Sequence, residues 1–146
     1  MFIVTTQADG ELAGCLVGFA SQVSIRPRRF LVGLSDKNHT FAVASRASHL
    51  IVHVVRRDDR ELAELFGEQT GDTVDKFARC SWQPGPHDVP VLAGPPAWFS
   101  GRILLRERLG DHVAFLLEPE QGSAGEDLGD LLTFSDVSDL QAGHDA

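Results

Sequence analysis

The stretch that decides the fold runs from Cys15 to Phe41, CLVGFASQVSIRPRRFLVGLSDKNHTF. It holds two apolar, strand-like runs joined by a small, polar turn with Pro27, whose fixed φ interrupts strand pairing. It ends in a polar cluster, Ser35–Thr40. Only Lys37 and Lys76 among the 13 basic residues are lysines, so a lysine inside this cluster stands out. Two donor-rich turns separated by one strand suit a phosphorylated ligand.

The size and composition of the chain indicate one domain with a full core, because it has 146 residues of which 42% are hydrophobic. The chain contains no apolar run of the roughly 18 residues that a membrane helix needs. Its N-terminus, MFIVTTQADGE, lacks the basic and apolar regions of a signal peptide. Cys15 and Cys80 form no CxxC pair, which argues against a disulfide framework or a structural zinc site. We therefore expect a cytoplasmic protein without a membrane span.

The net charge of −8 is concentrated at the C-terminal end. Acidic and basic side chains balance over residues 1–117, whereas residues 118–146 carry eight acidic residues and no Lys or Arg. No basic stripe rises above this balance, so nucleic acid is not an expected partner. The acidic segment at about 118–146 is interpreted as solvated surface.

Apolar periodicity predicts mostly short strands along the chain. They are expected at 2–6, 13–19, 23–25, 30–34, 49–55, 98–105 and 112–117, the last two joined by a hairpin turn at 108–111. Strands in such numbers, with few helices between them, indicate a closed or partly closed β-barrel.

Helices are expected only as short insertions. Residues 40–48 have apolar positions on one helix face. Residues 61–67 are amphipathic, with an Asp at 58 or 59 to cap the helix and Gly67 to end it. Residues 70–77 predict a turn and a short helix, 128–140 predict a docked tail with a short helix, and the five prolines in 82–97 predict loop.

Two clusters offer donors to a phosphate. Ser21, Gln22 and Ser24 lie in the first turn region, and the run from Lys37 to Thr40 forms the second. Each cluster alone is also ordinary turn chemistry. Neither a GxGxxG nor a Walker A pattern is present, which argues against Rossmann and P-loop nucleotide sites.

The sequence pattern leaves the roles of three histidines open. His112 follows a Gly-Asp pair at a hairpin mouth, where it is either a proton donor or anion ligand, or a surface residue. His49 and His53 are four residues apart, a metal-ligand spacing on a helix, but their run is strand-like, so we expect no metal site. The chain has no Gly-x-Ser-x-Gly elbow, which leaves a hydrolase without support.

Taken together, these motifs resemble the flavin reductase-like, FMN-binding split-barrel family. The resemblance begins with Gly18–Ser24, Pro27, the strand at 30–34 and Asn38-His39-Thr40. It continues in order with the strand-helix unit at 50–66, with Asp75-Lys76-Phe77 and with Gly110-Asp111-His112, and it covers about residues 8–118.

The resemblance implies a mainly β, split-barrel fold of Greek-key type with two or three short helices. It implies one domain over residues 1–146 that forms a homodimer and binds flavin near the subunit interface. Hydride would pass from NADH or NADPH to FMN or FAD, and the reduced flavin could supply a partner monooxygenase. His112 would be the catalytic residue, near the flavin ring or the nicotinamide. The residues implied in cofactor binding are Phe19, Ala20, Ser21, Gln22, Ser24, Ser35, Lys37, Asn38, His39, Thr40 and Lys76.

Two other functions remain open at this point. The first is a module that binds a flavin or a deazaflavin without turning over a nicotinamide. The second is a β-barrel interaction protein without a cofactor. Flavin absorbance of the purified protein, followed by anaerobic addition of NADH, separates the three functions.

Overall fold

The computed structural model describes residues 1–143, which form one seven-stranded antiparallel sheet and a small hairpin. The order in the sheet is β2-β1-β5-β8-β9-β4-β3, and β6 pairs with β7. The strands are β1 (Phe2–Ala8), β2 (Glu11–Val17), β3 (Ala20–Ile25), β4 (Arg28–Ser35), β5 (His49–Val54), β6 (Trp82–Pro84), β7 (Pro90–Leu92), β8 (Ala97–Arg108) and β9 (His112–Ala124). The structure confirms the expected mainly β fold, with every predicted strand present.

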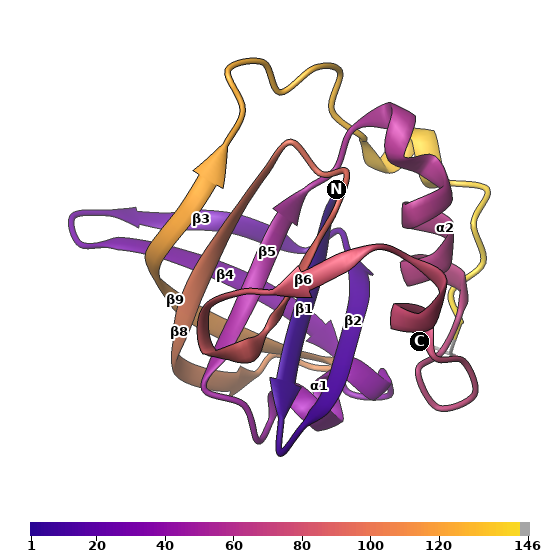
Figure 1. Ribbon diagram of the computed structural model, residues 1–146. Coiled ribbons are helices and arrows are strands. Elements are labelled where there is room, and N and C mark those ends of the chain that lie inside the picture. Colours follow the sequence, from indigo (N-terminus) through magenta and orange to yellow (C-terminus); the bar gives the residue numbers. More distant parts are fainter. Residues whose placement is uncertain (144–146) are drawn as a thin grey trace.

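The sheet curls so that residues from its two ends share one core (Figure 1). Val4 and Cys15 from β1 and β2 pack in the same apolar cluster as Val32 and Leu34 from β4. Phe115 of β9 lies in the middle of this cluster and is fully buried. The small helix α1 (His39–Ala44) contacts β1, β2 and β4, and covers one end of the core.

A second apolar cluster lies on the outer face of the sheet. Ile3, the neighbour of Val4 on β1, points to this face because successive strand residues alternate. It packs with Ala63 and Phe66 of the helix α2 (Arg60–Glu68). The hairpin of β6 and β7 also covers this face and contacts β1 and β5 through β7. Both faces of the central strands are therefore buried.

Two local details differ from the sequence analysis. The loop-rich segment 82–97 also contains the β6–β7 hairpin, which was not predicted; Pro84 pairs with Pro90 at its end, as prolines can at strand edges. Gly67 does not end α2, which continues to Glu68. A Cβ on Gly67 would lie 3.1 Å from Leu16 Cδ2, so this glycine serves close packing against β2.

The other predicted short helices are present, but with different bounds. The helix expected at 40–48 ends at Ala44, and the turn and helix expected at 70–77 appear as a 3₁₀ helix at 76–79. The remaining 3₁₀ helices are η1 (Arg57–Asp59), η3 (Pro86–Asp88) and η4 (Phe134–Val137). None of the helices within residues 1–143 is long and apolar enough to cross a membrane.

The C-terminal segment docks against the N-terminal end of α2. Val137 of η4 is buried in the outer cluster. Arg60 Nη2 lies 2.6 Å from Asp139 Oδ2, and Arg57 Nε lies 3.2 Å from Asp136 Oδ1. Part of the predicted acidic segment therefore neutralises arginines of the same chain, while its last residues, 144–146, lie outside the described residues.

Candidate functional site

A cavity of about 510 Å³ opens where β2, β4 and the start of β9 meet, and we name it the Phe19 cavity. Four of the predicted site residues line it: Phe19, Ser35, Asn38 and His112. Its walls are otherwise mainly apolar, with Cys15 and Val17 from β2 among the lining residues. Residues that are far apart in the sequence, at 15–19, 33–38 and 112, thus meet at one cavity.

An aromatic pair forms one wall of the Phe19 cavity. The rings of Phe19 and His112 meet edge to face, with centroids 5.0 Å apart, and Phe19 is 67% exposed. Gly33 makes this approach possible, because a Cβ there would lie 3.2 Å from Phe19 Cβ and 4.0 Å from His112 Cδ2. The backbone N–H of Gly33 also donates to Phe19 O at 2.7 Å. The Phe19 backbone is therefore held against β4, and its exposed ring can contact a planar ligand.

The turn between β4 and α1 supplies the polar edge of the cavity. Ser35 is buried and pairs with His112 across the β4–β9 ladder. The Asn38 carboxamide oxygen accepts from Thr40 N–H at 2.8 Å and so caps α1. Asp36 N–H donates to Asp111 O at 3.0 Å, which ties this turn to the β8–β9 turn. The two turns therefore position the serine, the asparagine and the histidine as one unit.

Charged side chains lie near His112, which lines the same cavity. Hydrogen bonding from His112, with Nδ1 2.8 Å from Asp111 Oδ1, lowers the pKa of the Asp111 carboxyl, and the charge of Lys37 lowers it further. Lys37 itself is exposed. A cation, a histidine and a carboxylate thus lie close together at the mouth, an arrangement that can meet an anionic group.

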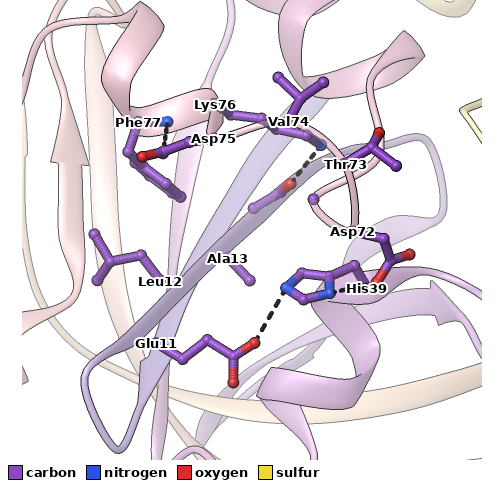
Figure 2. Close-up of a pocket in the computed structure, with 12 residues that line it drawn as sticks. Glu11, Leu12, Ala13, His39, Asp72, Thr73, Val74, Asp75, Lys76 and Phe77 are labelled. Atoms are coloured by element: carbon purple, nitrogen blue, oxygen red, sulfur yellow. Dashed lines mark hydrogen bonds and ion pairs between the residues drawn. The ribbon is translucent and has the colours of Figure 1, made fainter.

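A second cavity, of about 490 Å³, lies on the other side of α1, and we name it the His39 cavity (Figure 2). His39 points into it between two carboxylates: Nε2 lies 3.3 Å from Glu11 Oε1 and Nδ1 lies 2.9 Å from Asp72 Oδ1. Hydrogen bonding from His39 is the main cause that lowers the pKa of Asp72. His39 and its neighbour Asn38 therefore face different cavities.

Lys76 is buried at the base of the His39 cavity. Its Nζ donates to Gly14 O at 2.9 Å and to Phe66 O at 3.3 Å, and burial lowers the pKa of the ammonium. These contacts link β2 to the end of α2. Lys76 therefore lines the His39 cavity and not the Phe19 cavity, although its charge acts on the thiol of Cys15, which lines the Phe19 cavity.

The remaining predicted residues lie on β3 and on α1. Ala20 packs against the inner core, while Ser21 and Gln22 are exposed. Gln22 Nε2 donates to Ser24 O at 3.1 Å across a β-bulge between these two residues. Thr40 is buried. Figure 1 shows the β3–β4 hairpin extending beyond the rest of the sheet. Polar Ser21 and Gln22 and apolar Val23 and Ile25 are all exposed on its first strand.

Two residues that line the Phe19 cavity carried no functional prediction. Cys15 is buried as expected, burial raises the pKa of its thiol, and the Thr40 hydroxyl hydrogen-bonds to it. Gly33 interrupts the apolar run 30–34, and an isolated glycine inside a strand is the signal that marks a close approach. This glycine carried no prediction, and no signal in the sequence names the two side chains that meet there.

His53 has a structural role, because its ring joins neighbouring strands. It is fully buried, its Nδ1 lies 3.1 Å from Ile3 O, and its Nε2 accepts from Leu92 N–H at 3.0 Å. The neutral ring with a proton on Nδ1 satisfies both contacts. Burial lowers the pKa of His53 to about 4.

Comparisons with known proteins identify the family and the fold of this chain. Residues 1–139 match the family described as flavin reductase like domain. The 4-hydroxyphenylacetate 3-monooxygenase reductase component of Escherichia coli is 27% identical over 117 residues, covering 80% of this chain and 69% of that protein. FMN reductase (NADH) RutF of Methylorubrum extorquens is 27% identical over 75% of this chain, which spans 53% of that relative.

Solved structures show the same fold. The flavin reductase domain protein from Arthrobacter sp. FB24 superposes with a TM-score of 0.81 at 27% identity, covering 90% of this chain and 79% of that one. An FMN-binding protein from Thermus thermophilus gives a TM-score of 0.81 at 23% identity, with coverage of 87% and 71%. The resemblance drawn from the sequence motifs is therefore confirmed.

Proposed function

The chain belongs to the flavin reductase-like domain family, and from this premise we propose that it reduces FMN or FAD with NADH or NADPH. The relatives named as an FMN reductase (NADH) and as a monooxygenase reductase component support this activity. We also propose that the reduced flavin serves a partner monooxygenase.

The observation that carries the proposal is the composition of the Phe19 cavity. Sites for flat cofactors are mostly apolar hollows of about 300–1,000 Å³ with a few convergent polar groups. The Phe19 cavity has this size and character, with Phe19 and Val17 as apolar walls and Ser35, Asn38 and His112 at one edge. The residues present therefore fit an isoalloxazine ring with a polar chain.

We assign a separate task to each side chain. Phe19 contacts the ring plane, and Ser35 and Asn38 hold the polar edge or the ribityl chain. Lys37 binds the phosphate, because an ammonium beside backbone donors suits an anion. His112 lies nearest the reacting ring and orients the nicotinamide or moves a proton. The flavin supplies the hydride chemistry, and the protein supplies position and electrostatics.

The decisive experiment measures cofactor binding and turnover on the same sample. Protein freed of flavin is titrated with FMN and with FAD under absorbance, and NADH or NADPH oxidation is then followed anaerobically. We expect saturable flavin binding and pyridine-nucleotide oxidation that depends on flavin. Binding without oxidation would leave a flavin-binding module, and no binding would remove both functions.

We further propose a homodimer that uses the projecting β3–β4 hairpin. Val23 and Ile25 on β3 are 51% and 76% exposed, and the exposed Leu105 lies on β8. Exposed apolar side chains in such numbers favour an interface. Light scattering after gel filtration should give a dimer for the wild type and a monomer for Ile25→Glu. A monomeric wild type would refute this proposal.

A further inference from the structure

A second cluster of chemically active side chains lies away from the Phe19 cavity, on the outer face of the sheet. It comprises His49 at the start of β5, His87 in the turn between β6 and β7, and Glu120 on β9. One ligand atom from each residue lies within 4.8 Å of the others. Three segments far apart in sequence therefore present two imidazoles and a carboxylate to one point.

The ligand atoms of the three groups lie close together. His49 Nε2 lies 3.1 Å and His87 Nε2 lies 3.7 Å from the same oxygen, Glu120 Oε2. The two rings are stacked, with centroids 3.5 Å apart and planes 11° apart. A tetrahedral ion with bonds of about 2.1 Å places its ligand atoms about 3.4 Å apart. Because the stacked rings hold their in-plane lone pairs in nearly parallel planes, the half-exposed His87 ring must rotate out of the stack to bind the same cation as His49 Nε2.

The strand geometry explains why Glu120 reaches this face. Ser100 pairs with Gln121 and Gly101 pairs with Pro119, so Glu120 is the extra residue of a β-bulge. A bulge re-aims a side chain that the regular alternation would point elsewhere. Glu120 Oε1 lies 3.5 Å from Arg102 Nε, so the arginine holds one oxygen while the other faces the histidines.

The surroundings fix the ring of His49 and the backbone of His87. His49 is buried, and its Nδ1 lies 2.8 Å from Ser48 Oγ, which leaves Nε2 toward the cluster. Such a partner on the second nitrogen is typical of histidines that bind metals. The carbonyls of His49 and His87 accept from the side chains of two consecutive residues of β1, Thr6 and Gln7, at 2.9 Å each.

The turn that presents His87 is strained. His87 and Asp88 both have positive φ, 58° and 60°. This region is uncommon for residues other than glycine, and two such residues in succession require support from their surroundings. The turn thus holds the His87 ring over His49 in a conformation that local preferences alone would not choose.

We propose that His49, His87 and Glu120 bind a divalent transition-metal cation of the Zn²⁺ class. Two imidazoles and one carboxylate form a ligand set that Zn²⁺ accepts, with the exposed side left for water. The bound ion joins the turn at His87 to β5 and β9 and thereby fastens the β6–β7 hairpin to the sheet. The site is separate from the proposed flavin site and does not depend on it.

The test is Zn²⁺ binding to untagged protein that has been stripped with a chelator and dialysed. Calorimetry with Zn²⁺ alone should give one equivalent for the wild type. His87→Ala and Glu120→Gln should each weaken binding at least ten-fold, and Ser48→Ala by roughly ten-fold, as for partners of ligating histidines. Glu118→Gln is the matched control, since Glu118 lies on the same strand and pairs with Arg29 and Arg102. It should retain binding.

Thermal unfolding and the absorbance of bound Co²⁺ test the site further. Zn²⁺ should raise the melting temperature of the wild type and of Glu118→Gln but not of His87→Ala, because a ligand that binds only the folded state stabilises it. Co²⁺ should give ligand-field bands without a thiolate charge-transfer band. Equal Zn²⁺ affinity in wild type, His87→Ala and Glu120→Gln would overturn the site. A thiolate band, or a wild type that does not bind millimolar Zn²⁺, would overturn it as well.

Discussion

The burial of His53 predicts a specific loss of stability in acid. The neutral ring donates from Nδ1 to Ile3 O and accepts at Nε2 from Leu92 N–H, so it joins β1 and β5 to the hairpin strand β7. Protonation would turn the acceptor at Nε2 into a donor that faces another donor. The folded state therefore resists protonation, and burial lowers the pKa of His53 from 6.5 to about 4.

The direction and size of the effect follow from linkage between proton binding and folding. The unfolded chain binds the proton near pH 6.5 and the folded protein only near pH 4, so acid favours unfolding. The contribution is fully present above pH 6.5 and is lost as the pH falls toward 4. With about 1.4 kcal/mol for each pH unit, the wild type should lose about 2 kcal/mol by about pH 5 and about 3 kcal/mol by about pH 4.

Urea unfolding of wild type and His53→Gln at a series of pH values tests this prediction. The glutamine does not titrate, so the difference between the two proteins isolates His53 from other acid-sensitive groups. The stability advantage of the wild type should shrink as the pH falls from neutral. Parallel pH profiles would refute the reasoning. If the variant does not fold, NMR titration of the wild-type ring gives the same answer, and a midpoint near its ordinary pKa would contradict it.

The remaining predictions concern the two cavities. Lys37→Ala should weaken the binding of FMN relative to that of riboflavin by roughly 10- to 100-fold, which is the size of a charge-assisted contact. Arg79→Ala is the control and should not change this ratio. Equal losses of affinity for both flavins would exclude a phosphate contact. His112→Ala should lower turnover and largely keep flavin affinity in the same titrations, and unchanged turnover would remove it from the site. Gly33→Ala should weaken flavin binding, since the new Cβ would lie 3.2 Å from Phe19 Cβ; unchanged affinity would show that this ring is not a contact. Lys76→Met should lower the urea midpoint because two carbonyls lose a donor, yet leave the ratio of FMN to riboflavin affinity unchanged.

The fold could be predicted from the sequence because its central strands are apolar on both faces and are bounded by strong turn signals. Hydrophobic runs such as 30–34 and 49–55 mark buried strands whichever elements cover them. The β6–β7 hairpin was not predicted because its prolines favour a loop. Val89 and Val91 pack against Ile51, and only this packing explains why a strand forms there. Tertiary contact, and not local preference, decides that segment.

The candidate site was accessible only in part, because a motif fixes which residues are close in sequence but not which way each side chain turns. Asn38 and His39 are adjacent, yet one caps α1 beside the Phe19 cavity and the other lies between Glu11 and Asp72 in the His39 cavity. The two lysines show the same limit. Lys37 is exposed beside Asp111, whereas Lys76 is buried on backbone carbonyls. In the sequence both stand out because lysine is rare in this chain. Only their burial distinguishes a lysine that can bind a phosphate from one that holds two secondary-structure elements together.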